Sequence, residues 1–471
     1  MGRLLVLVAL MVWGSDAWAQ AQGLDVVDLA EAKAAPSSLW DRARSVLGLA
    51  AILAIAWGLS VRKGAVAWRL VAAGLGLQFV LALLVLSPWG QAAFGAVNVG
   101  VTELLQVSTV GASFVFGRLA QSYSLPVGTS VVPRPDPSTD AWLEAAKSAP
   151  VAADPSTVGF VEVGAWIAFN ILPTIIFFSS LMAILYHLGV MGRIIQGLAW
   201  LMRRTLGTTG PETLSAAGNI FVGQTEAPLM IRPFLARMSE SELMAVMTAG
   251  FATVAGGVMV AYVQMLEPVF PSIAGHLLSA SLMSAPAALV LAKIMVPEAK
   301  NGDAAVHVEL PESQDTNVID AAARGAGEGL QLALNVGAML IAFVALVALA
   351  NGVLGGLGGA VGLDGLTLER ILGWVIAPLA WLLGVPWGDA VAVGGLLGVK
   401  TVLNEFVAYS MLAGQAPDLD PRSVLISVYA LCGFANLGSI GIQLGGLAPL
   451  CPERRSDLAR LALRAMIAGN L

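Results

Sequence analysis

The sequence carries little charge. Only 12% of its 471 residues are Asp, Glu, Lys or Arg, whereas 57% are apolar; soluble domains have about 25% charged residues. This composition is typical of a polytopic membrane protein, in which helices or a closed barrel satisfy the backbone polar groups. The apolar segments are long and continuous rather than alternating, which argues against a barrel. We therefore predict an all-α polytopic membrane protein in a lipid bilayer.

Cysteine, histidine and strong net charge are also scarce. Cys432 and Cys451 are too few for a disulfide framework, and we interpret them as packing residues. The three histidines have no metal-ligand spacing, and a net charge of −6 without a basic stripe predicts no nucleic-acid partner. The sequence has no G-x-G-D motif and no Ser–His pair in a catalytic context. We therefore predict that the chain is not an enzyme, against the alternative of an intramembrane hydrolase with two carboxylates.

A leader precedes the first span. Arg3 is followed by an apolar run and by Ala-Trp-Ala at positions 17–19. This pattern predicts a secretory signal peptide over residues 1–19, with an uncleaved signal anchor as the alternative. Basic residues in the loop at 62–69 place that loop in the cytoplasm. The expected location is therefore the inner membrane of a bacterium, with several spans.

Hydropathy predicts about eight transmembrane helices and interfacial helices. The stretch at 211–237 is too short and too interrupted to cross the bilayer twice, and the stretch at 368–385 carries Pro378 at its middle, as a hairpin tip would. Residues 45–206 are expected to form N-terminal scaffold helices, with an exposed loop rich in Pro, Ser and Asp at 121–158. Residues 207–296 are expected to form a first repeat, with one hairpin and the spans that follow it. A polar linker at 297–325 leads to a second repeat at 326–471, with the other hairpin and broken helices.

Three segments of the N-terminal part carry more specific predictions. Segment 90–120 is only moderately apolar and contains polar side chains, so we expect a helix at the interface or packed against protein. Segment 161–188 is a long apolar stretch and is expected to span. Segment 191–206 has arginines among apolar residues, which predicts an amphipathic interfacial helix.

Two polar runs interrupt apolar stretches. The first is Gln224-Thr225-Glu226 and the second is Asn404-Glu405. A carboxylate at membrane depth costs about 2.5–3.5 kcal/mol on insertion scales, so an intramembrane glutamate indicates a functional site. Two of them, each beside an amide, predict a polar solute between them.

The second half of the chain repeats a pattern of the first. The run at 250–256, Gly-Phe-Ala-Thr-Val-Ala-Gly, is similar to the run at 433–439, Gly-Phe-Ala-Asn-Leu-Gly-Ser. Each run follows its glutamate, Glu226 or Glu405, by a similar distance. Interrupted helices at matching positions indicate a transporter built from inverted-type repeats, whose solute and ions bind near the bilayer midplane.

The polar side chains suggest how a solute would be held. Gln224 and its two neighbours offer amide, hydroxyl and carboxylate groups that suit a flat heterocycle, and Glu405 can accept hydrogen bonds from two adjacent hydroxyls. Asn436 and Ser439 are three residues apart, so they share one helix face or both border a break. Phe434 offers a ring for packing, although an ordinary core position is the alternative.

A cation site is suggested by oxygen-bearing side chains near the breaks. A hard cation such as sodium takes oxygen ligands from unwound backbone and from amide or hydroxyl groups. Asn219 and Thr253 are suitable side chains, and a hydrogen bond between helices is the alternative for each. Glu226 alone could cap a half-helix, but the roughly 0.3–1 kcal/mol gained there is less than the insertion cost.

Long segments of the sequence resemble one family. Residues 223–229 (GQTEAPL), 403–409 (LNEFVAY) and 430–443 (ALCGFANLGSIGIQ) resemble the signature segments of concentrative nucleoside transporters, and the tail at 452–459 is similar to theirs as well. The resemblance extends from about Trp166 to the last residue.

The resemblance implies a homotrimer and an elevator-type motion, with two broken helices and two re-entrant hairpins, at 211–237 and roughly 368–385, in each transport domain. It implies that one group of residues binds the nucleoside base: Gln224, Thr225, Glu226 and Val258, with Phe434 beside it. It implies that the ribose is held by Glu405, Asn436 and Ser439. It also implies a sodium site formed by Asn219, Val222, Thr253 and Val254. The predicted function is a sodium-coupled symporter that imports nucleosides, and the alternative is proton coupling through Glu226 or Glu405.

Overall fold

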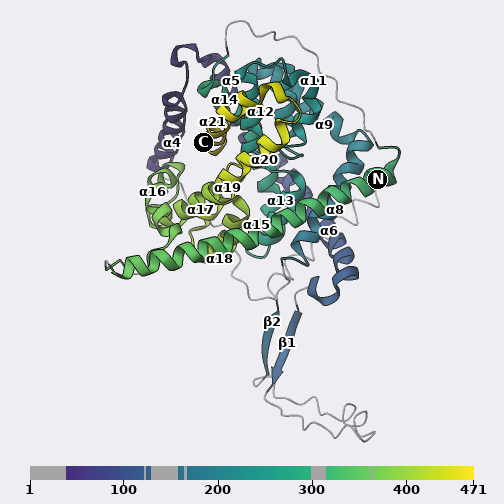
Figure 1. Ribbon diagram of the computed structural model, residues 1–471. Coiled ribbons are helices and arrows are strands. Elements are labelled where there is room, and N and C mark those ends of the chain that lie inside the picture. Colours follow the sequence, from purple (N-terminus) through teal and green to yellow (C-terminus); the bar gives the residue numbers. More distant parts are fainter. Residues whose placement is uncertain are drawn as a thin grey trace, which may run out of the picture.

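The computed structural model describes residues 39–120, 123–128, 158–163, 167–298, 315–360, 362–363 and 365–471. The predicted signal peptide at 1–19, and most of the loop at 121–158 and of the linker at 297–325, lie outside these ranges. The described chain is predominantly helical, as predicted (Figure 1). Within it, five helices are long and apolar enough to cross a membrane, or six if one bent pair is counted as a span.

The N-terminal helices differ in part from the prediction. They are α4 (Leu39–Gly58), α5 (Trp68–Leu86) and α6 (Pro88–Phe116), with short 3-10 helices η1 (Lys63–Ala65) and η2 (Gly117–Ala120). Helix α6 packs against α14 and α8, so the predicted contact with protein is confirmed. However, its part from Gly95 to Phe116 also has the length and hydropathy of a span.

Two strands replace part of the expected span and loop. Strand β1 (Tyr123–Gly128) pairs antiparallel with β2 (Val158–Val163), from Tyr123 opposite Val163 to Gly128 opposite Val158. The pair extends away from the helices in Figure 1. The predicted span at 161–188 is therefore wrong at its beginning, because the Val- and Phe-rich start of that segment is extended and has a strand partner. Helix α8 begins only at Ile171 and ends at His187.

The segment at 191–206 is helical, as predicted. Helix α9 (Val190–Leu206) is bent by 77° from α8. The glycines on either side of α9, Gly189 (φ 71°) and Gly207 (φ 70°), have left-handed backbone conformations. This conformation is accessible to glycine without the steric cost that a Cβ brings.

The first predicted hairpin is present as a helix, a break and a short return. Helix α10 (Gly210–Gly218) is followed by non-helical residues and then by η3 (Ala227–Ile231) and α11 (Arg232–Leu235). The start of α10 is fixed by a capping box, in which the Thr209 N–H donates to Glu212 Oε1 at 2.9 Å. The helices that follow are α12 (Glu240–Ala252), α13 (Gly256–Leu266) and α14 (Ile273–Met295).

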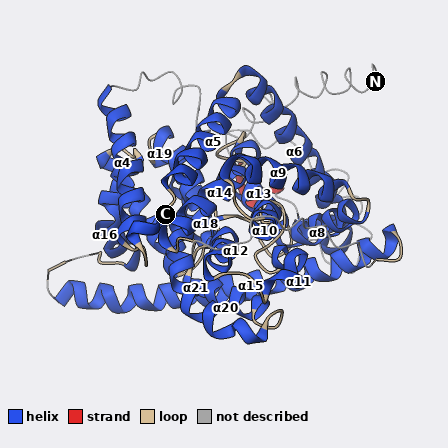
Figure 2. Ribbon diagram, turned by 90° about the horizontal axis from the view of Figure 1, so that it is seen from above, coloured by secondary structure: helices blue, strands red, loops and turns tan. Residues whose placement is uncertain are grey.

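The second half begins with the long helix α15 (Val318–Ala360), followed by α16 (Leu368–Leu383). The prediction of a hairpin tip at Pro378 is wrong, because Pro378 lies inside α16. Membrane helices tolerate proline where neighbouring groups satisfy the freed backbone. Helix α16 packs against α4 and α17, and α4 and α16 lie together at one side of the molecule in Figures 1 and 2.

The remaining elements are short helices separated by breaks. They are η4 (Trp387–Asp389), α17 (Ala390–Val402), α18 (Glu405–Gln415), η5 (Ala416–Asp418), α19 (Pro421–Leu431), α20 (Leu437–Leu447), η6 (Pro452–Arg454) and α21 (Arg455–Asn470). The interruption between α17 and α18 falls at Leu403-Asn404. This interruption, rather than the expected one near Pro378, carries the second polar run.

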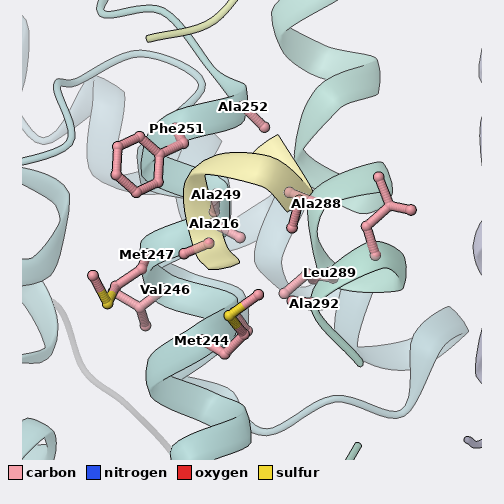
Figure 3. Close-up of a cluster of buried hydrophobic side chains, with 14 of the residues drawn as sticks. Ala216, Met244, Val246, Met247, Ala249, Phe251, Ala252, Ala288, Leu289 and Ala292 are labelled. Atoms are coloured by element: carbon pink, nitrogen blue, oxygen red, sulfur yellow. The ribbon is translucent and has the colours of Figure 1, made fainter. Parts of the chain in front are cut away.

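The core surrounds α12. Eleven of its thirteen residues are buried, and α10, α14 and α21 pack against it. Figure 3 shows Met244, Met247 and Phe251 of α12 beside Ala216 of α10 and Ala288 of α14. Small residues at these positions let the helix backbones approach closely. The core therefore holds α12 firmly against the first hairpin.

Candidate functional site

Two helix breaks lie directly against each other at the centre of the site. The break between α12 and α13 contains Thr253, and the break between α19 and α20 contains Phe434, whose N–H donates to the Thr253 carbonyl at 3.3 Å. Gly433 has φ +123°, and a Cβ built on it would lie 2.8 Å from the Ala252 carbonyl oxygen. Glycine is therefore required for this approach. The two similar sequence runs thus meet in space, as expected for repeats whose half-helices end at a midplane site.

The carboxylate of Glu405 is the centre of one polar group. Its Oε1 accepts a hydrogen bond from the Tyr262 hydroxyl at 2.8 Å, and its Oε2 accepts one from Asn436 Nδ2 at 3.0 Å. Glu405, Tyr262 and Asn436 are 5%, 0% and 2% exposed. Since a carboxylate has about four lone-pair positions, two of them stay available for hydroxyl donors.

Local capping explains why these side chains face one another. Asn404 Oδ1 accepts from the Val407 N–H at 2.9 Å and caps α18. Asn436 Oδ1 accepts from the Ser439 N–H at 2.8 Å and caps α20. An N-cap asparagine satisfies one of the free N–H groups at a helix start. The cap fixes the orientation of the Asn436 side chain, so its Nδ2 is directed to Glu405.

The tip of the first hairpin forms a second polar group. Gln224 is buried, whereas Glu226 is exposed and accepts a hydrogen bond from the Thr225 hydroxyl at 2.9 Å. A Cβ built on Gly446 of α20 would lie 2.5 Å from Thr225 Cγ2. The tip is also joined to the start of α13, because the Gly256 N–H donates to the Phe221 carbonyl at 2.9 Å.

Helix α20 connects the two groups. Its first residues hold Glu405 through Asn436, and its later turns contact the hairpin tip through Gln443 and Gly446. From Asn436 to Gln443 the helix rises about 10 Å. The remaining predicted contacts of the base lie at the breaks: Val258 is buried in α13, and Phe434 is half-buried.

The predicted sodium residues lie on adjoining breaks. Asn219 is 1% exposed, its Nδ2 donates to the Ser215 carbonyl at 3.0 Å, and its Oδ1 has no hydrogen-bond partner among the described residues. Thr253 is 1% exposed, and its hydroxyl donates to the Ala249 carbonyl at 2.8 Å, which leaves its oxygen lone pairs free to face a cation. Val222 and Val254 are the other two residues, through their carbonyls. A buried amide oxygen without a donor fits a hard cation.

Several contacts of the site were missed by sequence reasoning. Tyr262 lies four residues after Val258 on the same helix face, and that spacing was the available signal. Lys400 is 2% exposed, and its ammonium donates to the Ala430 carbonyl, at the end of α19, at 3.3 Å. A buried ion pair joins Lys293 of α14 to Glu212 of α10 at 2.7 Å.

Residues of the C-terminal tail hydrogen-bond to the segment that follows the first hairpin. Arg454 donates to the carbonyls of Ala236 and Met238 and, at 2.8 Å, to Asp457. Hydrogen bonds from Arg454 and Arg460 lower the pKa of Asp457. Arg460 also forms an ion pair with Glu240 at the start of α12. The tail residues that resemble the family thus have a positioning role.

Two cavities lie in other parts of the described chain. One, of about 340 Å³, is lined by α4, α14, α16, α17, α19 and α21 and includes Lys400 and Cys432. Another, of about 470 Å³, includes Arg62, Glu240 and Arg464. Neither of these two cavities is lined by a predicted substrate residue.

Three family models match successive parts of the chain. Residues 47–119 match the profile of the Na+ dependent nucleoside transporter N-terminus, residues 168–269 match "Nucleoside recognition", and residues 276–471 match the Na+ dependent nucleoside transporter C-terminus. A transporter of Bacillus subtilis, YutK, is 42% identical over 90% of this chain and 95% of its own. The chain belongs to the concentrative nucleoside transporter family.

Other relatives extend the comparison. The rat sodium/nucleoside cotransporter 2 is 39% identical over 90% of this chain, which spans 60% of that longer protein. Among solved structures, the transporter CNTnw in an inward-facing substrate-bound state has 42% identity and a TM-score of 0.77, covering 91% of this chain and 94% of its own. A double variant of CNTnw in an outward-facing state has a TM-score of 0.76. The resemblance predicted from the sequence is confirmed, and as a member of this transporter family the protein is not an enzyme.

Proposed function

We propose that this concentrative nucleoside transporter imports nucleosides across the bacterial inner membrane by sodium symport. The observation that carries the proposal is the buried Glu405 carboxylate at the meeting point of three interrupted helices, with Asn436 and Tyr262 as donors. Its free lone pairs suit the two adjacent hydroxyls of a ribose. The buried Gln224, beside Thr225, Glu226, Val258 and Phe434, suits the base. Ser439 lies next to Asn436 and completes the sugar end.

Sodium coupling is supported by the paired breaks. Asn219 has a free buried amide oxygen, and Thr253 lies in the break that contacts the hairpin tip and Phe434. One sodium ion that enters gains about 2.3 kcal/mol per 100 mV of membrane potential. Since about 1.4 kcal/mol corresponds to tenfold accumulation, one ion is sufficient to concentrate a neutral solute. Coupling requires that ion and nucleoside strengthen each other's binding.

The ion is tested by uptake into proteoliposomes. We expect uridine uptake to require an inward sodium gradient and to stop when choline replaces sodium at constant pH. Uptake that persists in choline and collapses with a protonophore would instead assign coupling to protons through Glu226 or Glu405. Recovery of intact labelled uridine inside the vesicles distinguishes transport from chemical conversion.

The sugar site is tested with Glu405→Gln. The variant keeps the side-chain size but loses the charge that strengthens hydrogen bonds from hydroxyls, so we expect uridine uptake to be lost. Glu103→Gln is the matched control, because Glu103 is exposed on α6. Normal uptake by Glu405→Gln would remove Glu405 from the ribose role.

We further propose that the protein is a homotrimer in which the hairpins and broken helices move as an elevator. In support, the long apolar helix α15 is mostly unburied within one protomer, and Leu334, Ile341 and Leu349 on it are more than 60% exposed. Such a face needs lipid or another protomer against it. Chemical crosslinking in membranes tests the trimer, and a dimer or monomer as the largest product would contradict it.

A further inference from the structure

Gln443 is a buried amide that belongs neither to the proposed ribose residues nor to the proposed sodium residues. It lies on α20, one turn after Ser439, and the buried residues of that helix are Ser439, Gln443 and Leu447, which form one face. Gln443 is 0% exposed. Its Nε2 donates to the Met247 carbonyl of α12 at 3.0 Å. This bond fixes the orientation of the amide, since a flip would place two oxygens against each other.

The fixed orientation leaves a buried acceptor without a partner. The Oε1 atom of Gln443 has no hydrogen-bond donor among the described residues. An unsatisfied buried polar group costs about 1–3 kcal/mol, so such a group in a native structure requires an explanation. The strongest explanation is a donor that is brought by a ligand.

Gln224 lies beside Gln443, on the other side of one glycine. A Cβ built on Gly250 of α12 would lie 2.5 Å from Gln443 Nε2 and 2.9 Å from Gln224 Cβ. The Oε1 atom of Gln224 is also buried without a partner in the described part of the chain. The Gln443 amide and the Gln224 side chain therefore border the same glycine, next to the hairpin tip where the base is proposed to bind.

Gln443 is separated along α20 from the ribose end of the site, since it lies about 10 Å of helix rise from Asn436, which holds Glu405. On α12 its Nε2 lies against Met247 and Gly250, and the proposed sodium ligand Thr253 is three residues beyond Gly250, about 4.5 Å of helix rise. The amide thus lies toward the base end of the site, and the sodium dependence of uptake distinguishes a contact with the base from a contact with the ion.

We propose that Gln443 is a specificity-determining residue that favours nucleosides with an exocyclic amino group on the base, such as cytidine and adenosine, over their keto counterparts. The inference rests on the proposed function and deepens it. The Gln224 amide can turn either its carbonyl oxygen or its N–H toward the base, so it bonds the ring N–H of uracil and hypoxanthine and the ring lone pair of cytosine and adenine alike. The Gln443 oxygen, which the Met247 bond holds in place, is satisfied by an amino group and meets a keto oxygen unfavourably, since carbonyl oxygens only accept. A site built to bond an N–H discriminates against the analogue that lacks it.

The test is a specificity ratio measured in Gln443→Met. Methionine has a similar length and flexibility but lacks the amide oxygen. Uptake of labelled cytidine and uridine, and of adenosine and inosine, is measured in the same proteoliposomes. We expect the cytidine-to-uridine and adenosine-to-inosine ratios of kcat/KM to fall about fivefold, the order expected for one neutral hydrogen bond. A general loss of packing lowers the rates for all four nucleosides and leaves these ratios unchanged.

Gln415→Met is the matched control. Gln415 also has a buried amide oxygen without a partner among the described residues, but it is the last residue of α18, ten residues after Glu405. We expect its ratios to equal those of the unaltered protein. Unchanged ratios in Gln443→Met would overturn the proposal. If the ratios are unchanged and half-maximal uptake requires a higher sodium concentration, the proposal is also overturned, because the Gln443 oxygen then contacts the ion. If the unaltered protein transports none of the four nucleosides, the proposed function fails instead.

Discussion

Replacing Gly433 with alanine is expected to separate the two helix breaks that form the site. Gly433 is buried and has φ +123°, a conformation that side-chain-bearing residues rarely adopt. Imposing it on alanine costs about 1–3 kcal/mol. The new Cβ would also lie 2.8 Å from the Ala252 carbonyl oxygen and 3.0 Å from that of Phe251. These are backbone atoms that cannot rotate away, so overpacking adds about 1–3 kcal/mol. The combined cost is about 2–6 kcal/mol.

The strain is relieved most easily by moving the α19–α20 break off α12. That movement breaks the bond from the Phe434 N–H to the Thr253 carbonyl and shifts Asn436 relative to Glu405. We therefore expect lower thermal stability in detergent, together with a rise in the KM for nucleoside and in the sodium concentration for half-maximal uptake. Both quantities change because the two breaks carry residues of both sites.

The measurement is size-exclusion chromatography after heating, combined with uridine uptake over a range of sodium concentrations. Gly441→Ala is the control, because Gly441 is an exposed residue of α20 with no atom within 4 Å of a built Cβ. An alanine in a helix is favoured over glycine by about 1 kcal/mol, so this variant should be as stable as the unaltered protein or more so. Equal stability and transport in Gly433→Ala and Gly441→Ala would refute the reasoning.

Two more variants test single contacts. Tyr262→Phe removes one of the two side-chain donors to Glu405. Since a hydrogen bond to a charged group contributes about 1.5–3 kcal/mol, kcat/KM for uridine should fall about tenfold or more. Uridine uptake at the rate of the unaltered protein would contradict this. Glu212→Ala removes the nearer of the two carboxylates paired with the buried Lys293 ammonium and leaves Glu298 at 2.9 Å. The free energy of unfolding should therefore fall by less than the roughly 3–5 kcal/mol that a fully unpaired buried charge costs. The double variant Glu212→Leu with Lys293→Met should recover most of the lost stability. A double variant no more stable than Glu212→Ala would show that the Lys293 ammonium left without Glu212 is not the cause of the loss.

Much of the fold follows from local patterns. The polar run at 224–226 and the glycines around it predict the first hairpin, because charge and breaks cannot continue an apolar helix through lipid. The error at Pro378 has the same origin: proline is a strong local signal, but α16 packs against α4 and α17 and remains one helix. The strands β1 and β2 pair over about 30 intervening residues, a contact that no local periodicity predicts.

The contacts of the site that depend on local spacing were predicted, whereas those between distant segments were not. Asn436 and Ser439 were grouped by their three-residue spacing, and the structure joins them through a cap, with Asn436 at the break before α20 rather than on a helix face. Tyr262 and Glu405 are 143 positions apart, and only the packing of α13 against α18 brings them together. Glu226 was expected to resemble Glu405 in its surroundings, yet it is exposed at the hairpin tip.

The sequence by itself determined that this chain is a helical membrane protein with two polar interruptions and an internal repeat, because insertion energetics and hydropathy depend on composition and order along the chain. The tertiary structure decided which interruptions touch. A close approach such as that of Gly433 to Ala252, or a free amide oxygen such as that of Gln443, depends on the positions of residues from distant segments. Those positions result from the packing of all the helices together, which no single segment encodes.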